Sequence, residues 1–330
     1  TALFGKGGTT PPVADLILPF IVLGLALTAV LYGVTARLTM RPLKVLAAAA
    51  RRIADGELGA QVESPMPTEL AIVASEFNSM SARLAQADMR RRAEMEKARQ
   101  IQRHLLPAQR AFADPPLAWR YEPATEVAGD YVDVRAVGDA LLVVVADVAG
   151  HGVPAAMGAA MLKTLFSGAV SQTSNPSVIL AEINQGFAAV TPDEDFASMI
   201  VLSYDQNGNT LRHASAGHEP AYLMRGGAVA QTLSATGPLL GISEEGQWLA
   251  EDVAVAPGDL LIIVTDGLVE TRAPDGRQFG RERLSAILGD GETEPLDDLL
   301  SRLLASASTL RGNADQEDDI TLVAMRFCRR

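Results

Sequence analysis

Apolar, strand-like runs that carry aspartates at their ends recur through the last two-thirds of the chain. They contain Asp130 and Asp133 in EVAGDYVD, Asp147 in LLVVVADVAGHG, Asp266 in LLIIVTDG, and Asp318 and Asp319 in DDITLVAMRF. A carboxylate at the mouth of a buried strand is costly unless a partner compensates its charge. Converging carboxylates also repel one another unless a cation lies among them, and hard divalent cations bind through oxygen ligands. The pattern predicts buried strands that bring carboxylates to a divalent-metal site.

Two metal ions in such a site activate a water molecule and hold a phosphoryl group, so we expect a phosphate-ester hydrolase. Cysteine chemistry is disfavoured, because the single cysteine, Cys328, lies two residues from the end. One cysteine excludes a disulfide framework and a cysteine metal cluster. The four histidines are too scattered for a transition-metal cluster, so His151 in the Asp147 motif is interpreted as a turn residue or an outer-shell residue.

The net charge of -12 is unevenly distributed along the chain. Residues 37–110 hold 13 Lys and Arg against 8 Asp and Glu, whereas residues 111–330 hold 14 against 31. A strongly acidic C-terminal region argues against nucleic acid as a partner and suits a site that recruits divalent cations.

Residues Ile17–Ala36 form a run of 20 residues without a formally charged side chain, long enough to span a membrane as a helix. Basic residues follow the run, beginning with Arg37 and Arg41, which places the C-terminal side in the cytoplasm by the positive-inside rule. A signal peptide would carry its basic residues before the run. A buried core helix is the other alternative, and the length and uniformity of the run disfavour it.

The chain begins at Thr1 without a methionine, and residues 1–16 are interpreted as a short extracytoplasmic segment. We expect a fragment, whose missing N-terminus holds another membrane helix and a sensor. The expected location is therefore the cytoplasmic membrane, with one visible transmembrane helix and a cytoplasmic catalytic domain.

Two amphipathic helices are predicted after the membrane span, over Pro42–Ala54 and Glu69–Leu84, with a connector between them. Each has one apolar stripe, which a parallel dimeric four-helix coiled coil would bury. Residues 37–90 resemble a HAMP domain in Arg41-Pro42-Leu43, Asp55-Gly56-Glu57-Leu58, Glu69-Leu70 and Phe77-Asn78-Ser79-Met80. The resemblance implies a homodimer; a generic coiled-coil linker is the alternative.

The second stripe continues with interruptions at Arg91 and Glu94, so we expect a helical linker over residues 91–112 that Pro107 ends. A weakly packed coiled coil can be shifted between two conformations by a small free-energy change, which makes the helix at 81–106 a candidate switch. A solvated helical spacer is the alternative.

From about residue 113 onward, strands and helices mix. Strands are predicted over Leu141–Ala146, Ser198–Tyr204, Leu260–Thr265 and Ile320–Phe327, with a hairpin of Tyr222–Met224 and Val229–Leu233. Helices are predicted over Pro154–Ala169, Asn175–Val190, Arg281–Leu288 and Leu296–Ser308. The expected fold class is α+β, a layered β-sandwich flanked by helices.

Residues 100–330 resemble the SpoIIE-like branch of the metal-dependent (PPM, type 2C) serine/threonine protein phosphatases. The matching motifs, in the family's order, are Gln100-Ile101-Gln102 through Leu105-Leu106-Pro107, Glu126-Val127-Ala128-Gly129-Asp130-Tyr131 with Asp133, Ala146-Asp147-Val148 with Gly150-His151-Gly152, Ala216-Gly217-His218, Thr265-Asp266-Gly267, and Asp318-Asp319-Ile320-Thr321. Ala128 and Ala149 depart mildly from the family pattern, which has glycine or serine there.

The resemblance implies a phosphatase domain over residues 113–330 that binds two Mn²⁺ or Mg²⁺ ions. By the same resemblance, the catalytic and metal-binding residues are Asp130, Asp147, Asp266 and Asp318, with Val148 contributing a backbone carbonyl and Asp319 as the alternative to Asp318. The implied reaction is hydrolysis of phosphoserine or phosphothreonine by a metal-activated water, without a phosphoenzyme. Substrates in the family are often STAS-type anti-sigma-factor antagonists.

Some assignments stay open at this point. Gly217-His218 lies near no aspartate motif along the chain and is interpreted as a turn between strands. Arg120, Arg135 and Lys163 are equal candidates for a phosphate contact. A catalytically silent module that binds a partner protein is the alternative function; a chemoreceptor or kinase-like output does not fit the C-terminal half.

Overall fold

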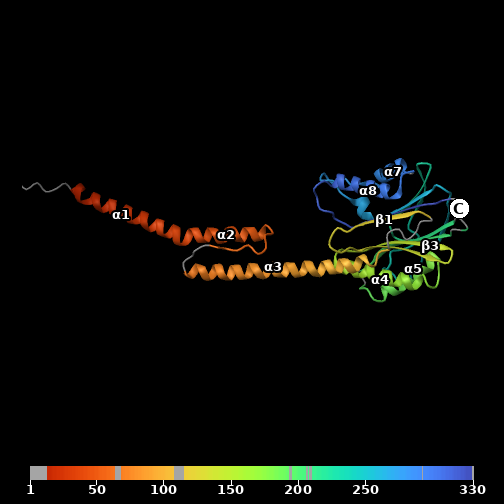
Figure 1. Cartoon of the computed structure of the whole chain (residues 1–330), viewed down its shortest axis with the longest axis horizontal. Helices are drawn as coiled ribbons and strands as arrows, with labels where there is room; N and C mark the ends of the chain where they lie inside the picture. The colour runs from red at the N-terminus through yellow and green to blue at the C-terminus, as the bar shows by residue number, and fades with distance from the viewer. Residues whose placement is uncertain are drawn as a thin grey trace, which may run out of the picture. The chain divides into compact units, whose positions relative to one another are not determined.

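The computed structural model describes residues 13–63, 68–107, 115–192, 195–205, 207, 210–291 and 293–328. The chain divides into two compact units, Thr1–Glu94 and Met95–Arg330. Figure 1 shows the helices and strands with their labels.

The first unit begins with the apolar helix α1 (Val13–Thr35), which continues through a π-helical turn η1 (Ala36–Met40) into α2 (Arg41–Ala54). Within the described residues, Ile17–Ala54 is the one helical stretch long and apolar enough to cross a membrane, and its most apolar window has a mean hydropathy of 2.4. The predicted apolar helix is therefore present.

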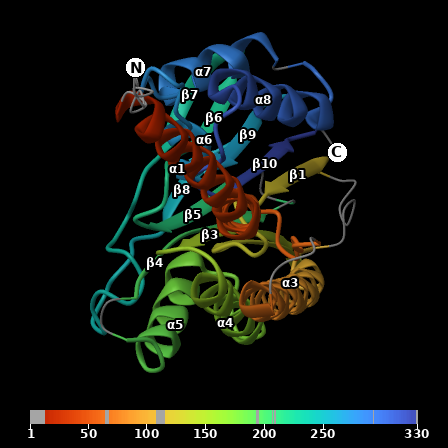
Figure 2. The same cartoon turned by 90° about the vertical axis from the view of Figure 1, so that its left-hand side faces the viewer.

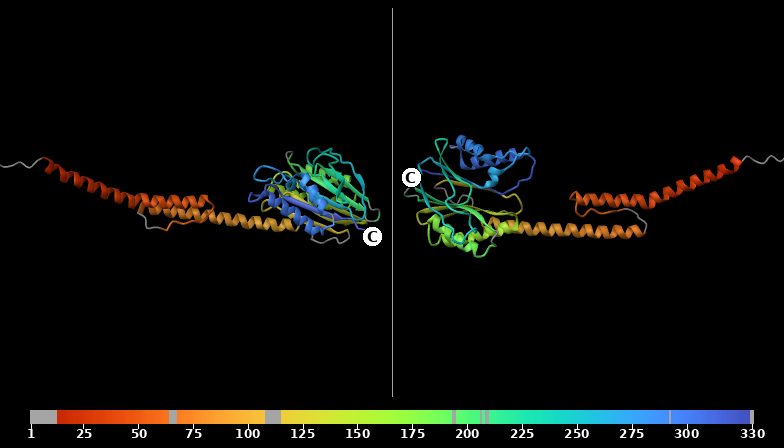
Figure 3. Two further views of the ribbon diagram at one scale, coloured as in Figure 1. Left: turned by 90° about the horizontal axis from the view of Figure 1, so that it is seen from above. Right: turned by 180° about the vertical axis from the view of Figure 1, so that it is seen from behind.

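Helices α2 and α3 (Thr68–Arg103) lie side by side in this unit (Figures 1 and 3). A small core of Ala49, Val62 and Ala74 joins them. The connector is held to α3 by Asn78, whose side chain accepts a hydrogen bond from the Val62 amide at 2.8 Å and donates one to the Val62 carbonyl at 3.2 Å. Ser81 donates similarly to the carbonyl of Ala60. The predicted helix-connector-helix arrangement is present, and Pro65 and Pro67 of the predicted connector lie outside the described residues.

An apolar stripe on these helices is exposed in the single chain. Its residues are Leu43, Ile72, Val73, Met80 and Leu84. Helix α3 runs without a break to Arg103, four residues before the predicted end at Pro107, and a turn follows. The predicted boundary between linker and catalytic domain at 112–113 lies outside the described residues.

The second unit is built on two antiparallel five-stranded sheets. One has the order β1-β10-β9-β6-β7 and the other β2-β3-β4-β5-β8. The strands are β1 (Leu117–Glu122), β2 (Asp130–Val137), β3 (Ala140–Val148), β4 (Ala197–Asp205), β5 (Thr210–Ala216), β6 (Ala221–Arg225), β7 (Ala228–Leu233), β8 (Glu251–Ala254), β9 (Leu260–Val264) and β10 (Ile320–Arg326).

Helices cover the outer faces of both sheets, as Figure 2 shows. Helices α4 (Val153–Ala169) and α5 (Pro176–Ala188) pack on the β3 sheet, and α7 (Gly280–Asp290) and α8 (Leu296–Arg311) pack on the β9 sheet. The short helix α6 (Asp266–Glu270) follows β9 directly. This is the predicted α+β layered sandwich with flanking helices.

Strands β3, β9 and β10 bury both faces, which explains their continuous apolar runs. In β3, Leu142 and Val144 face α4 and α5, whereas Leu141, Val143 and Val145 pack between the two sheets. The alternation fixes the register of each strand, because a one-residue slip would move every side chain to the other face. The strand ends, and with them the aspartates, are therefore held in defined positions.

Candidate active site

Two of the predicted aspartates face each other across neighbouring strands. Asp130 is the first residue of β2 and pairs in register with Asp147, near the end of β3. The strands are antiparallel, so the start of one and the end of the other meet at the same edge of the sheet. The register alone brings these two carboxylates together.

Asp130 is buried, with 2% of its surface exposed, and it links the two sheets. Its Oδ2 accepts hydrogen bonds from the hydroxyl of Thr265 at 3.0 Å and from that of Thr321 at 2.5 Å. Thr265 follows β9 and Thr321 lies in β10, both in the opposite sheet. The two hydroxyls partly compensate the cost of burying this carboxylate and fix its orientation.

Asp266 is the first residue of α6, so it lies just beyond the predicted strand end. The glycine after it is required by close packing. A Cβ built on Gly267 would lie 2.0 Å from the carbonyl oxygen of Asp319, a separation that no side chain tolerates. Glycine after Asp266 therefore lets α6 approach the loop that carries Asp318. This approach adds the carboxylates of Asp266 and Asp318 to those of Asp130 and Asp147.

Asp318 and Asp319 have different surroundings. Asp319 is 6% exposed, and its two oxygens accept hydrogen bonds from the backbone amides of Ala124 at 2.7 Å and Gly129 at 2.8 Å. Asp318 is exposed, and its Oδ1 accepts a hydrogen bond from the backbone amide of Asp319 at 2.8 Å. Asp319 thus holds the loop before Asp130 in place, whereas Asp318 keeps an oxygen available at the opening.

The electrostatics of the cluster indicate a shortage of positive charge. Burial, together with the charges of Asp266 and Asp318, raises the pKa of Asp147 to about 8. Burial and the charge of Asp318 raise the pKa of Asp266 to about 6, and burial and Asp147 raise the pKa of Asp130 well above its usual value. Carboxylates that resist ionisation in this way are stabilised by a bound cation.

The donor set fits a hard cation that keeps much of its water. Among the described residues, no three Asp, Glu, His or Cys side chains form a group that would hold an ion alone. Mg²⁺ and similar ions are commonly bound by one or two carboxylates, with water and substrate oxygens completing the shell. The Val148 carbonyl is a further oxygen at this edge. A Cβ on Gly129 would lie 2.7 Å from that oxygen, so glycine leaves it uncovered on this side.

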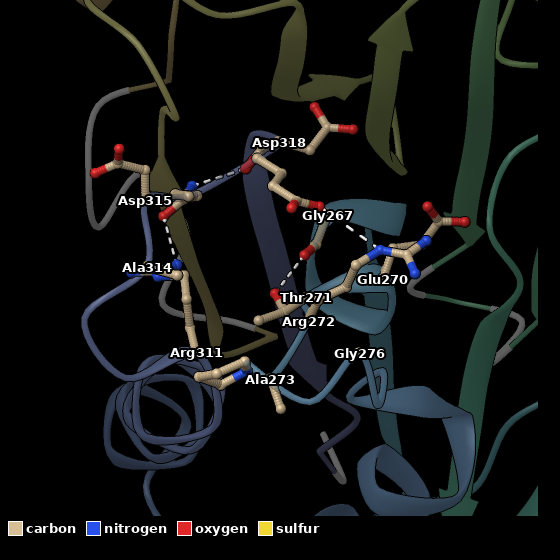
Figure 4. A pocket seen from close by; sticks show the side chains of 13 residues that line it. Gly267, Glu270, Thr271, Arg272, Ala273, Gly276, Arg311, Ala314, Asp315 and Asp318 are labelled. Atoms are coloured by element: carbon tan, nitrogen blue, oxygen red, sulfur yellow. Dashed lines mark hydrogen bonds and ion pairs between the residues drawn. The ribbon is translucent and has the colours of Figure 1, made fainter.

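Two cavities flank the carboxylates. Figure 4 shows the first, of about 390 Å³, with Asp318 at its upper rim and Arg311 at its lower end. Its wall is tied together by Arg272, which pairs with Glu317, and by Gln316, which donates to the Asp318 carbonyl at 2.8 Å.

The second cavity, of about 360 Å³, touches both Asp147 and Asp266. It is also lined by His218, Glu219 and Arg281. The sequence did not point to this cluster, since the His218 motif was interpreted only as a turn. It is a turn between β5 and β6, and it also borders the site.

The cations proposed for phosphate contact lie elsewhere. Arg135, on β2 itself, binds Asp133 at 3.2 Å, and Lys163 binds the same carboxylate at 2.7 Å and so ties α4 to β2. Arg120 pairs with Asp297 on α8. His151 is exposed in the loop before α4, in agreement with its interpretation as a turn residue.

Comparisons with known proteins identify the family of each part of the chain. The model of the family Stage II sporulation protein E (SpoIIE) matches residues 138–328, more than half of the chain, and the HAMP domain model matches residues 34–86. The chain is 28% identical over 330 residues to Protein IcfG of Synechocystis sp., covering 86% of this chain and 51% of that protein.

Two further similarities concern phosphatases. The chain is 26% identical over 205 residues to Phosphoserine phosphatase RsbU of Bacillus subtilis, covering 62% of this chain and 61% of that protein. The solved SiaA-PP2C domain of Pseudomonas aeruginosa is 26% identical, with a TM-score of 0.68, over 74% of this chain and 99% of that chain. The chain spans between about half and three-fifths of the length of these two curated relatives.

Proposed function

Because the chain belongs to the SpoIIE family of metal-dependent PP2C-type serine/threonine phosphatases, we propose that residues 113–330 hydrolyse phosphoserine or phosphothreonine on a regulatory protein. The observation that carries the proposal is the gathering of strongly perturbed carboxylates at one edge of the two sheets. Perturbed groups beside a cavity are typical of functional sites.

We assign two Mn²⁺ or Mg²⁺ ions to this cluster. Their ligands would be Asp130, Asp147, the Val148 carbonyl, Asp266 and Asp318. Such ions supply activation of the attacking water and neutralise charge on the phosphoryl oxygens. Asp147 would be the central ligand of this set, because its carboxylate interacts electrostatically with Asp266 and Asp318 and forms a hydrogen bond with Asp130.

The chain's own residues hold these ligands in place. Thr265 and Thr321 orient Asp130 through its Oδ2. Asp319 fixes the backbone that leads to Asp130, so we prefer Asp318 to Asp319 as the metal ligand. Pre-orientation of this kind matters because outer-shell partners of metal ligands change affinity or activity by about 10- to 100-fold.

Hydrolysis of p-nitrophenyl phosphate by the full chain in detergent tests the proposal, with Mn²⁺, with Mg²⁺ and with EDTA. We expect metal-dependent turnover that Asp266→Ala lowers by more than about 100-fold, because even outer-shell changes reach that size. Asp252→Ala is the control, since Asp252 is an exposed aspartate on β8 that pairs with Arg212.

Undiminished turnover in Asp266→Ala would exclude the metal assignment. A folded chain that binds no Mn²⁺ in calorimetry would instead favour the alternative function, a silent module that binds a partner protein.

The N-terminal unit supports a membrane-anchored, dimeric signalling phosphatase. We propose a transmembrane helix over residues 17–36, a HAMP domain over 37–90 and a helical linker over 91–112. The exposed apolar stripe on α2 and α3 supports a homodimer, because a second copy would bury it. The basic residues after the span support a cytoplasmic catalytic domain.

Helix α3 supports a regulatory connection to the catalytic domain. Gln102 near its end is 7% exposed and forms two hydrogen bonds with Ala128, to the carbonyl at 2.6 Å and from the amide at 3.1 Å. Ala128 lies two residues before Asp130, so a shift of the helix would reach the metal site. Equal turnover of chains that begin at residues 37 and 113 would show that the helix is only a spacer.

The proposed substrate is a phosphoprotein of the STAS class of anti-sigma-factor antagonists. Support comes from family membership, and from the relative RsbU, which is named a phosphoserine phosphatase. Release of phosphate from phosphorylated STAS proteins of the source organism, compared with unrelated phosphoproteins, would test this choice.

A further inference from the structure

One arginine lines the cavity that touches both Asp147 and Asp266. Arg281, the second residue of α7, is the one Lys or Arg side chain among the described residues of this wall, which also carries Glu219 and Glu270. A phosphorylated serine or threonine bears between about one and a half and two negative charges at neutral pH. Acidic side chains repel such a group, so the one positive side chain on the wall is the candidate to hold it.

The chain brings Arg281 to this place by folding back after α6. The amide of Phe279 donates a hydrogen bond to the Thr271 carbonyl at 2.8 Å, and the Phe279 ring is buried in the core of its sheet. Gly280 then turns the chain with φ +75, in the left-handed region that favours glycine. These contacts fix the start of α7 beside α6, whose first residue is Asp266.

Glu219 holds the guanidinium of Arg281 in one orientation. Its two oxygens accept hydrogen bonds from Nε at 2.6 Å and from Nη2 at 2.8 Å. The Glu219 side chain is 7% exposed, so the anchor is fixed, whereas the Arg281 side chain is 63% exposed and open to a ligand. The pair uses two of the five N–H groups of the guanidinium and leaves Nη1 outside it. Arg281 therefore keeps donors for a second anion.

The arginines of the first cavity are less suited to this task. Arg272 pairs at 3.6 Å with Glu317, whose side chain is 74% exposed, so this partner does not fix it. Arg311 lies at the lower end of that cavity, away from Asp318 at the upper rim (Figure 4). Asp318 is also the one proposed metal ligand among the described residues that line the first cavity, against two in the second.

We propose that Arg281 is a phosphoryl-binding residue of this site, and that its Nη1 donates a hydrogen bond to a phosphate oxygen of the phosphorylated serine or threonine. This role rests on the proposed phosphatase function and adds a residue that lies outside the aspartate motifs. A guanidinium suits it, because the group is planar, always charged and matched to phosphate in geometry. Since Glu219 orients the side chain in advance, less rotamer freedom is lost when the phosphate binds.

Binding of inorganic phosphate to the full chain in detergent, with saturating Mn²⁺, tests this role. Calorimetry measures it directly, and competitive inhibition of p-nitrophenyl phosphate hydrolysis measures it independently. We expect Arg281→Ala to weaken phosphate binding about 10- to 100-fold, the range that one hydrogen bond to a charged group contributes. Arg281→Lys keeps the charge without the planar fork and should give an intermediate affinity. Both variants should keep the Mn²⁺ affinity and the melting temperature of the wild type.

Arg212→Ala is the matched control, because Arg212 forms the same kind of two-point pair with Asp252, at 2.6 and 2.8 Å, and does not line this cavity. It should leave phosphate binding unchanged. Glu219→Gln distinguishes a phosphate contact from a purely structural link between the loop and α7. It breaks the two-point pair and removes one negative charge, so we expect phosphate to bind no more weakly than in the wild type.

Unchanged phosphate binding in Arg281→Ala would overturn the proposed contact. A matching loss of phosphate affinity in Glu219→Gln would also overturn it, because Arg281 would then act only by holding the loop. A wild-type chain that neither hydrolyses the ester nor binds phosphate would instead show that the phosphatase function itself is wrong.

Discussion

Replacing Thr321 with valine removes one hydroxyl from the metal site and leaves the shape of the side chain nearly unchanged. That hydroxyl donates to Asp130 Oδ2 at 2.5 Å, and the remaining donor to the same oxygen is Thr265 at 3.0 Å. A hydrogen bond to a charged group contributes about 1.5–3 kcal/mol. Without it, the pKa of Asp130 rises further, because the bond from Thr321 opposes the effect of burial.

Metal binding requires the ionised carboxylate, so the lost bond should appear as weaker binding. At about 1.4 kcal/mol for each tenfold change, the expected loss is about 10- to 100-fold in Mn²⁺ affinity at pH 7. Calorimetric titration of the full chain measures it. Thr309→Val is the matched control, since Thr309 lies on the exposed side of α8 and donates only to the Ala305 carbonyl. A native melting temperature with wild-type Mn²⁺ affinity in Thr321→Val would refute the orientation of Asp130 by its hydroxyl donors.

Three further predictions concern packing, pH and the linker. Gly267→Ala should lower the melting temperature markedly, because the added Cβ overlaps the backbone of Asp319. Gly168→Ala should raise it slightly, because its Cβ meets open space and alanine favours the helix α4. Differential scanning calorimetry would measure both changes. The folded state raises the pKa of Asp147 to about 8, so it binds more protons than the unfolded chain between about pH 4 and 8. The metal-free chain should therefore lose stability as the pH rises from about 4 to 8, and Mn²⁺ should bind more tightly over the same range. Thermal melting in EDTA would test this, with a lower melting temperature expected at about pH 8 than at about pH 5. Gln102→Ala should destabilise the chain by about 1–3 kcal/mol in urea unfolding, because it leaves both polar groups of Ala128 unpaired.

The sandwich was predictable where strands are buried on both faces. The runs at β3, β9 and β10 are almost wholly apolar, so they stand out from the sequence. Strands β1, β5 and β8 were missed. Strands β1 and β8 lie at the edges of their sheets and carry charged and polar residues, and β5 contains Thr210, Arg212 and His213 and so has no continuous apolar run. Edge strands are half-exposed, and their composition resembles that of loops.

The carboxylates of the site were also predictable, because each occurs in a short motif at a strand end. The second cavity was not. His218 and Asp147 are brought together by the pairing of β3 with β4 and of β4 with β5, and no local pattern records that pairing. The difference between Asp318 and Asp319 likewise depends on backbone amides that lie far away along the chain.

Phosphate release from a phosphoserine peptide, titrated with Mn²⁺ for the full chain and for Asp147→Asn, tests the central claim most directly. The account predicts saturable activation of the wild-type chain by Mn²⁺, and a rate more than about 100-fold lower in the variant at every metal concentration, with the fold retained. Wild-type turnover that persists in EDTA, or a variant that turns over at the wild-type rate, would contradict a metal-dependent hydrolase built on these carboxylates.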